Sequence, residues 1–273
     1  MSEKGKTSRG ASRICPSEIR QILLFLIAVF AIPHGMAMAF SALQFDASAP
    51  SSVSATGGCV VAWVSVRGGV SASPCHAVGN GWVSPQCDNR GLVGFTSCSG
   101  TASPISFPLS ETGLVARAFI VADGAGVAVG STLLDAPCPL RIMLSEEDGA
   151  FHFATSSVLS AVGVSIDFAQ ATGFTPGPHI YEMELAEPCQ LCTIYIGGCP
   201  ATPAWRRSWN GAVREIILVS PSATGTDAAA IRSFLSRKWG IGKYRSGLAD
   251  EPAALRALGI KTDCIYGSMM IMR

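Results

Sequence analysis

The fold is decided by the segment Trp209-Asn-Gly-Ala-Val-Arg-Glu-Ile-Ile-Leu-Val219 and by the segment that follows it, Thr226-Asp-Ala-Ala-Ala-Ile-Arg-Ser-Phe-Leu-Ser-Arg-Lys-Trp239. The first is rich in β-branched residues and begins beside a glycine, which predicts a strand that follows a turn. The second starts with Thr226 as a candidate N-cap, carries Asp227 in its first turn and stops at Gly240. We therefore predict a strand followed by a helix.

This helix has one apolar stripe, formed by Ile231, Phe234 and Leu235, along which the stem of Lys238 can lie. The stripe predicts that the helix packs on a sheet. Residues 245–273, beyond the helix, are predicted to form a C-terminal tail that contains one candidate short helix, Pro252–Leu258.

The chain after Phe40 alternates short apolar segments with Gly, Pro, Ser and Asp, which is typical of strands joined by tight turns. More than eight such segments in about 200 residues favour two stacked antiparallel sheets. Residues 67–90 are rich in Gly, Ser and Cys and are predicted to form a long surface loop. The predicted strands are Leu43–Asp46, Cys59–Ser65, Gly91–Phe95, Leu114–Ala122, Gly126–Gly130, Leu140–Leu144, Phe151–Ala154, Ala161–Phe168, His179–Leu185, Cys192–Ile196 and Ala212–Val219.

One of these strands, His179–Leu185, alternates clearly. Ile180, Glu182 and Glu184 share one face of it, and apolar side chains occupy the other face. The pattern predicts that the apolar face is buried and that the two glutamates lie on a solvated face.

Together, these segments resemble a known family. The strand from Trp209 and the helix that ends in Lys238-Trp239-Gly240 resemble the closing strand and helix of concanavalin A-like (laminin-G-like) jelly-roll domains. The segments Leu43-Gln-Phe-Asp46, Val60-Val-Ala-Trp63 and Leu92-Val-Gly-Phe95 are similar to the first strands of such domains in bacterial surface proteins. The resemblance covers roughly residues 41–243.

The resemblance implies an all-β fold, a two-sheet antiparallel jelly-roll sandwich with one C-terminal helix packed on it. The sandwich would span residues 40–244. In this superfamily, which includes lectins, laminin-G modules, glucanases and adhesive spacers, the concave face or the loop rim often binds carbohydrate. Fold alone does not decide among these functions.

The first 39 residues have the order of a secretory signal. Basic residues from Lys4 to Arg20 precede an apolar leader helix, Ile22–Ile32, which is followed by Pro33 and the small-residue pattern Ala37-Met-Ala39. We expect cleavage after Ala39. An uncleaved signal anchor is the alternative, because apolar residues resume after the proline. Either way the following residues face outward, so an extracellular or cell-surface location is predicted, with a membrane contact only through an uncleaved leader.

Charge argues against nucleic acid as a partner. The chain has 20 Lys and Arg and 19 Asp and Glu, and its leader holds five of the basic residues and two of the acidic ones. The remaining chain therefore carries fifteen basic and seventeen acidic residues. A nucleic-acid-binding protein needs a basic surface to displace phosphate counterions, which this balance does not favour.

The chain contains ten cysteines, one of which, Cys15, lies in the leader. In an oxidising compartment the other cysteines are candidates for disulfides, although their spacing does not fix the pairing. Their odd number leaves at least one thiol free or paired between chains. The turn Cys189-Gln-Leu-Cys192 also fits half of a zinc site, but no second pair of ligands has the usual spacing. The candidates are Cys59, Cys75, Cys87, Cys98, Cys138, Cys189, Cys192, Cys199 and Cys264.

Motifs for catalysis are sparse. Glucanases of the resembling fold carry the strand motif E-x-D-x-x-E, and the nearest equivalent is Glu182-Met-Glu184, which lacks the central aspartate and the third carboxylate. A solvated strand face is the main interpretation of these two glutamates, and a divergent glycoside hydrolase is the alternative. His76, His152 and His179 accompany no nucleophile or zinc motif.

Loop aromatics are the candidates for binding. Trp82, and Trp205 with Arg206 beside it, could stack on and hydrogen-bond to a sugar, or they could pack at the edges of the fold. No cofactor is predicted, because no Asp or Asn cluster marks a calcium site, although calcium stays an alternative. We therefore expect a binding module for a glycan or an extracellular protein, with a structural or self-association domain as the second hypothesis.

Overall fold

The computed structural model describes residues 41–67, 69–75, 84–87, 92–95, 105–108, 114–124, 131–136, 141–144, 151–152, 161–170, 174–190, 193–198 and 208–262. All of them belong to one of the two units into which the chain divides, residues 38–273. The strands are β1 (Ala42–Asp46), β2 (Val53–Thr56), β3 (Cys59–Val64), β4 (Ser71–Pro74), β5 (Gln86–Cys87), β6 (Val93–Gly94), β7 (Ile105–Pro108), β8 (Leu114–Gly124), β9 (Thr132–Asp135), β10 (Arg141–Leu144), β11 (Phe151–His152), β12 (Ala161–Ile166), β13 (Ala169–Gln170), β14 (Gly177–Gln190), β15 (Thr193–Ile196) and β16 (Gly211–Val219), and the helices are α2 (Gly225–Trp239) and α3 (Glu251–Leu258).

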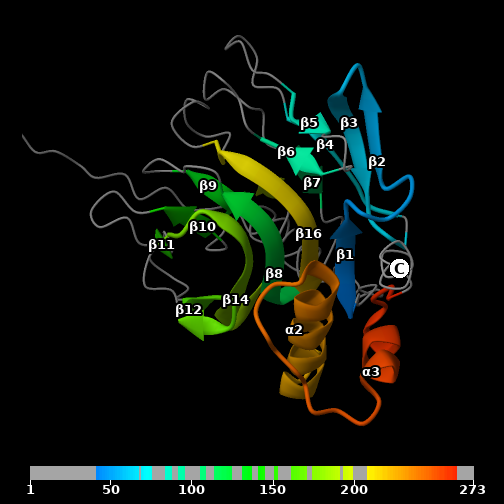
Figure 1. Ribbon diagram of the computed structural model, residues 1–273, viewed down its shortest axis with the longest axis vertical. Helices are drawn as coiled ribbons and strands as arrows, with labels where there is room; N and C mark the ends of the chain where they lie inside the picture. The colour runs from blue at the N-terminus through cyan, green and yellow to red at the C-terminus, as the bar shows by residue number, and fades with distance from the viewer. Residues whose placement is uncertain are drawn as a thin grey trace, which may run out of the picture. The chain divides into compact units, whose positions relative to one another are not determined.

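The strands form one large curled antiparallel sheet (Figure 1). Its hydrogen-bonded order is β11-β10-β9-β15-β7-β4-β3-β5-β6-β16-β8-β14-β12-β13, with β1 paired to β16 and β2 to β3. The prediction of a mostly antiparallel β fold is confirmed. The sequence predicts two sheets, but β4 pairs with both β3 and β7 and thereby joins the strands into one.

One part of the predicted strand pattern is corrected by the structure, and another lies outside the described residues. The segment 67–90 contains β4 and β5, so it is not simply a surface loop. Short polar strands such as Ser71–Pro74 lack the apolar alternation that makes a strand visible in a sequence. The predicted strand Gly126–Gly130 lies outside the described residues.

An inner core lies within the curl of the sheet. Ile120, Tyr181 and Ile216, from the adjacent strands β8, β14 and β16, are fully buried in it. Leu134 and Ile194, from β9 and β15, belong to the same core. Strands that are far apart along the hydrogen-bonded path therefore share one apolar interior, as expected of a sheet that curls over on itself.

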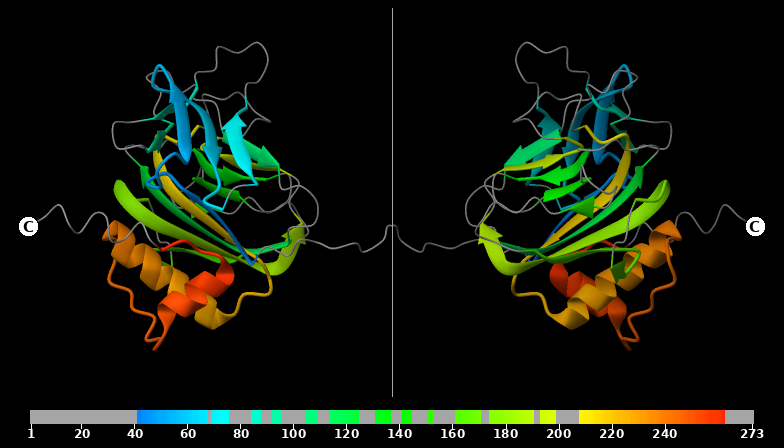
Figure 2. Two further views of the ribbon diagram at one scale, coloured as in Figure 1. Left: turned by 90° about the vertical axis from the view of Figure 1, so that its right-hand side faces the viewer. Right: turned by 90° about the vertical axis from the view of Figure 1, so that its left-hand side faces the viewer.

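A second apolar layer, the helix-side core, lies on the other face of β8, β14 and β16. Phe119, Ile180 and Ile217 from these strands are fully buried against Ile231 and Phe234 of α2. The views in Figure 2 show both helices lying against one face of the long strands. The predicted apolar stripe on α2 is thus confirmed.

The prediction that Glu182 and Glu184 lie on a solvated face is wrong for Glu182. Ile180 is fully buried and Glu182 is 4% exposed, whereas Glu184 is exposed. The reason is that the helices cover this face, and the Glu182 charge is neutralised by Arg232 of α2, as described below. Alternation along one strand does not reveal a covering helix that lies about forty residues later.

Helix α2 begins two residues earlier than predicted. Its N-cap is Thr224, not Thr226, because the Thr224 hydroxyl accepts from the amide of Asp227 at 3.2 Å while the Asp227 carboxylate accepts from the amide of Thr224 at 2.8 Å. This reciprocal arrangement is a capping box, which satisfies two backbone donors at once. The helix ends at Gly240, whose φ of 67° is the left-handed conformation that glycine adopts readily.

A second helix, α3, packs beside α2. The sequence predicts one helix packed on the sheet and gives Pro252–Leu258 only as a candidate short helix. Asp250 caps α3, Pro252 lies in its first turn and Gly259 ends it. Leu255 and Leu258 are buried in the helix-side core. The chain after residue 244 therefore packs against α2 through α3.

A buried ion-pair network ties α2 to the sheet. The Lys238 ammonium lies 2.5 Å from an Asp46 oxygen of β1 and 2.8 Å from a Glu215 oxygen of β16. Glu215 also accepts from Gln44 at 2.6 Å and from the Trp239 indole at 2.6 Å. Burial opposes the Lys238 charge, but the two carboxylates outweigh burial and raise the pKa of Lys238. Lys238, Trp239 and Glu215 thus join the end of α2 to the sheet through buried ion pairs and hydrogen bonds.

Candidate functional site

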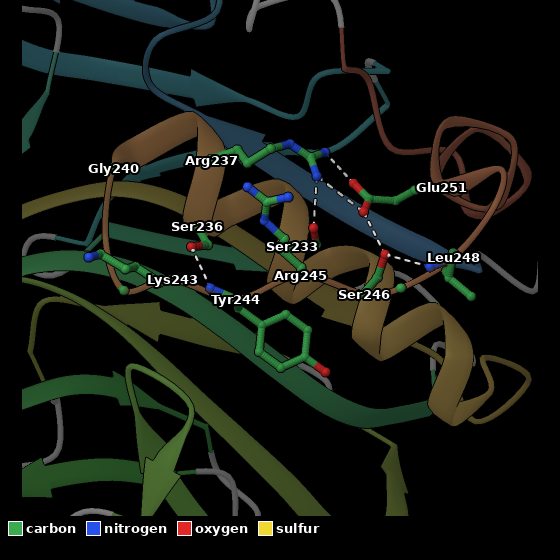
Figure 3. Close-up of a pocket in the computed structure, with 12 residues that line it drawn as sticks. Ser233, Ser236, Arg237, Gly240, Lys243, Tyr244, Arg245, Ser246, Leu248 and Glu251 are labelled. Atoms are coloured by element: carbon green, nitrogen blue, oxygen red, sulfur yellow. Dashed lines mark hydrogen bonds and ion pairs between the residues drawn. The ribbon is translucent and has the colours of Figure 1, made fainter.

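A pocket of about 700 Å³ lies beside the C-terminal half of α2, the connection to α3 and the start of α3 (Figure 3). We call it the α2–α3 pocket. Its volume is in the range of small-molecule binding sites. It is lined by Ser233, Ser236, Arg237, Gly240, Lys243, Tyr244, Arg245, Ser246, Leu248 and Glu251, together with Gly242 and Gly247.

The local sequence explains how the pocket forms. Ser233, Ser236 and Arg237 lie three and four residues apart, so they share one side of α2. The chain leaves the helix through Gly240 and turns at Gly242 and Gly247, which all have positive φ values between 63° and 70°. These turns bring the segment between the helices back beside α2.

An ion pair lies in the lining of the pocket. The Arg237 guanidinium pairs with the Glu251 carboxylate and donates to the Ser233 hydroxyl at 2.7 Å, and the Ser246 hydroxyl donates to Glu251 at 2.7 Å. Burial would raise the pKa of Glu251, but the hydrogen bonds from Arg237, Ser246 and Ser233 outweigh burial and lower it. Glu251 is therefore held as a carboxylate whose charge is compensated.

Two cations on the pocket wall have no such partner. Lys243 and Arg245 are exposed, and neither makes a hydrogen bond or ion pair with any residue that the structure describes. The pocket lining holds three basic side chains and one acidic one, Glu251. Since Arg237 neutralises Glu251, the remaining charge of the pocket is positive.

The connecting segment is anchored between these two cations. The Tyr244 amide donates to the Ser236 hydroxyl at 3.2 Å, and the Tyr244 ring packs against Phe168 with centroids 4.9 Å apart and against the Arg232 guanidinium at 5.8 Å. Figure 3 shows the ring on the side of the segment away from Arg237 and Glu251. These contacts hold the segment against α2 and against Phe168.

The stability of the pocket is expected to depend on pH through Glu251. Because its folded-state pKa is lowered, Glu251 contributes stability above the ordinary glutamate pKa of about 4.3, and this contribution is lost as pH falls through the folded value. E251Q should therefore lower the free energy of unfolding, measured in urea, more at about pH 7 than at about pH 3.5.

The exposed Glu187 of β14 offers a matched control. E187Q should change the unfolding free energy little at either pH. An E251Q deficit that is equal at both values would contradict the role assigned to the Glu251 charge.

The predicted carboxylate pair is engaged in ion pairs. Glu182 accepts two hydrogen bonds of 2.7 Å from Arg232 of α2 and lies 3.3 Å from Arg117 of β8, which also pairs with Glu184 at 2.5 Å. The hydrogen bond to Glu182 raises the pKa of Arg232. A carboxylate bound on both oxygens by guanidinium groups is poorly placed to transfer a proton, and Glu182 instead joins α2 to β14.

His179 makes a second local cluster. Its Nδ1 lies 2.7 Å from the Asp167 carboxylate, and its Nε2 lies 3.0 Å from both the hydroxyl and the carbonyl oxygen of Thr175. Asp167 also accepts from the Ile180 amide at 2.9 Å. These hydrogen bonds join the turn at Asp167 to β14 and to Thr175.

The other predicted site residues are only partly described. Trp82, Trp205 and Arg206 lie outside the described residues, as do Cys98, Cys138, Cys192, Cys199 and Cys264, and Cys189 is described only as part of β14. Cys59 and Cys75 carry free thiols in the structure. Cys59 pairs with Gln86 in the β3–β5 ladder, so the next residue, Cys87, points to the opposite face of the sheet.

The residues that line the pocket were not among those predicted. Ser233, Ser236 and Arg237 lie in α2 and Glu251 lies in α3, whereas the other lining residues lie in the segment between the helices, which has no periodicity. The signal that could have indicated this segment is the run Gly240 to Gly247, in which Lys243 and Arg245 lie between glycines at turn positions.

Neither a metal site nor a membrane span is found in the part of the chain that the structure describes. It contains no group of three or more His, Cys, Asp or Glu side chains that could hold a metal ion. It also contains no helix that is long and apolar enough to cross a membrane. Comparison with protein families, with curated protein sequences and with solved structures gives no match to this chain.

Proposed function

We propose that this protein is a secreted or surface-displayed binding module that recognises carbohydrate, and that its sheet is a concanavalin A-like jelly roll. The curled antiparallel sheet supports the fold assignment, because strands from distant parts of the path share the inner core. The network of Lys238, Glu215 and Trp239 supports it further, since it gives the closing motif a structural role.

The observation that carries the binding function is the α2–α3 pocket. Tyr244, the exposed side chains of Lys243 and Arg245 and backbone at glycines line it. An aromatic ring beside hydrogen-bond donors can pack against and hydrogen-bond to a sugar. The pocket is also preformed, because Tyr244 and the Arg237–Glu251 pair hold its walls, which lowers the ordering cost of binding.

The test is a glycan array probed with the purified, folded full chain, with and without calcium. We expect binding to a restricted set of glycans that disappears when the protein is unfolded by heat. A folded protein that binds no glycan on the array would contradict the proposed function.

A further inference from the structure

The ion-pair network between α2 and the sheet places an amino group against a carboxyl group in a buried site. The Lys238 nitrogen lies 2.5 Å from Oδ2 of Asp46 and 2.8 Å from Oε2 of Glu215. These three side chains are 5%, 1% and 0% exposed, in that order. The carboxyl carbon of Asp46 is one bond beyond the oxygen that Lys238 contacts, so the nitrogen and this carbon are close enough for a bond to form between them.

The surroundings of Lys238 favour an uncharged product over a pair of ions. Its nitrogen lies 5.5 Å from the centre of the Phe234 ring and 5.0 Å from the centre of the Trp239 ring. In water, an ammonium and a carboxylate are stabilised by hydration, which a buried site does not supply. Burial also raises the pKa of Glu215, so this site resists holding one cation and two carboxylates. Condensation to an amide removes two of the three buried charges.

The other oxygen of the Asp46 carboxyl group is held by two hydrogen-bond donors. Oδ1 accepts from the Ser48 amide at 2.9 Å and from the Ser48 hydroxyl at 2.6 Å. When an amine attacks a carboxyl carbon, negative charge collects on the oxygen that stays bound, and donors already aimed at that oxygen stabilise the transition state. Asp46 therefore has a nucleophile at one oxygen and a pair of donors at the other.

We propose that Lys238 and Asp46 condense to form an intramolecular amide (isopeptide) bond, with Glu215 as the proton-transfer group. Glu215 takes one proton from the Lys238 ammonium, and the freed electron pair of Nζ attacks the Asp46 carboxyl carbon, so that negative charge moves onto Oδ1. The bond from this carbon to Oδ2 then breaks as the charge returns from Oδ1. Oδ2 leaves as water, with one proton from Glu215 and one from Nζ. The amide nitrogen keeps its last hydrogen, Glu215 is regenerated and no co-reactant is consumed.

The bond would join β1 covalently to α2, across 192 residues. It needs the folded arrangement, because Asp46 lies in β1, Glu215 in β16 and Lys238 in α2. The ion-pair network is the state of the chain before this reaction, so the effects of the Lys238 charge on stability belong to the unreacted protein.

Mass spectrometry of the purified full chain, after reduction and alkylation of its cysteines, tests the proposal. We expect the chain to be lighter than its sequence requires by the mass of one water molecule. A tryptic digest should contain a branched peptide that joins Asp46 to Lys238. K238M should have its full mass, which excludes a cyclic imide at Asp46 as the source of the lost water. The matched control K261M, which removes an exposed lysine, should be cross-linked as the wild type is.

Two variants test the chemistry through the cross-linked fraction, sampled over time after cell-free synthesis. E215Q should slow formation of the bond by about tenfold or more, because glutamine does not accept the proton from Lys238. S48A removes one donor to Oδ1 from an exposed position and should also slow it by about tenfold or more. S54A, at another exposed serine, is the matched control and should react at the wild-type rate. Circular dichroism establishes that each variant is folded.

A wild-type chain of full mass, from which Asp46 and Lys238 are recovered only in unbranched peptides, would overturn the proposal. Equally fast cross-linking in a folded E215Q chain would overturn the role given to Glu215. S48A keeps the mechanism testable if E215Q does not fold, and an unchanged rate in S48A would overturn the role given to the Ser48 hydroxyl.

Discussion

Replacing Lys238 with methionine is expected to lower the free energy of unfolding by about 3–5 kcal/mol. Methionine preserves the length of the side chain but removes the charge between Asp46 and Glu215, whose side chains are 1% and 0% exposed. Breaking a buried ion pair by removing one partner is costly because the other charges stay buried without compensation. The burial that raises the pKa of Glu215 would then act with less opposition from a cation.

Chemical denaturation at neutral pH measures this loss, and K243M is the matched control. Lys243 is exposed and has no described partner, so its replacement should change stability by less than about 0.5 kcal/mol. Because the pKa of Lys238 is raised, the contribution of its charge is full below the ordinary lysine value of about 10.4 and is lost only as pH rises through the folded value. A K238M loss no larger than that of K243M would show that the network does not hold the fold.

G211A is the second variant with a large expected effect, and it should lower the free energy of unfolding by about 2–4 kcal/mol. A Cβ atom at Gly211 would lie 1.8 Å from the carbonyl oxygen of Asp123 and 2.8 Å from the indole nitrogen of Trp209. That carbonyl accepts from the Trp209 indole at 2.8 Å, so the added methyl group would both force apart β16 and β8 and displace this hydrogen bond. The backbone of β16 cannot move away from β8, because it is hydrogen-bonded to strands on both sides.

The comparison is G225A, in which the same change is made at the first residue of α2. A Cβ there would meet nothing within 4 Å, so stability should be unchanged or higher by up to about 1 kcal/mol. Thermal or denaturant unfolding of both variants gives the test. Equal stability of G211A and wild type would mean that β16 and β8 do not approach as closely as the structure shows.

Sequence patterns predicted the elements whose signals are local. The β-branched segment of β16 and the apolar stripe of α2 were found because their periods are 2 and 3.6 residues, which a few neighbouring residues suffice to show. The short strand β4 was missed because its partners in the sheet, not its own polar residues, make it a strand. The N-cap of α2 was misplaced because Thr224 and Thr226 both suit a cap, and only Asp227 three residues after Thr224 distinguishes them.

The burial of Glu182 and the formation of the α2–α3 pocket both depend on tertiary structure. Sequence patterns therefore do not predict them. The polar face of β14 has the pattern of a solvated face until a helix supplies Arg232 to pair with Glu182. Likewise, Arg237 and Glu251 are 14 residues apart and meet only because three glycines turn the chain between them. Such contacts follow from the path of the chain, which periodicity does not encode.

The place of β1 in the sheet sets the order in which the protein can fold. This strand pairs with β16, and Asp46 and Lys238 meet across 192 residues. The Lys261 amide closes a loop of 217 residues by donating to Gln44. Contacts so distant along the chain form slowly and only after the C-terminal segment has been synthesised. We expect a ribosome-bound chain that ends before residue 219 to stay open to proteases, because it lacks the end of β16 and all of α2.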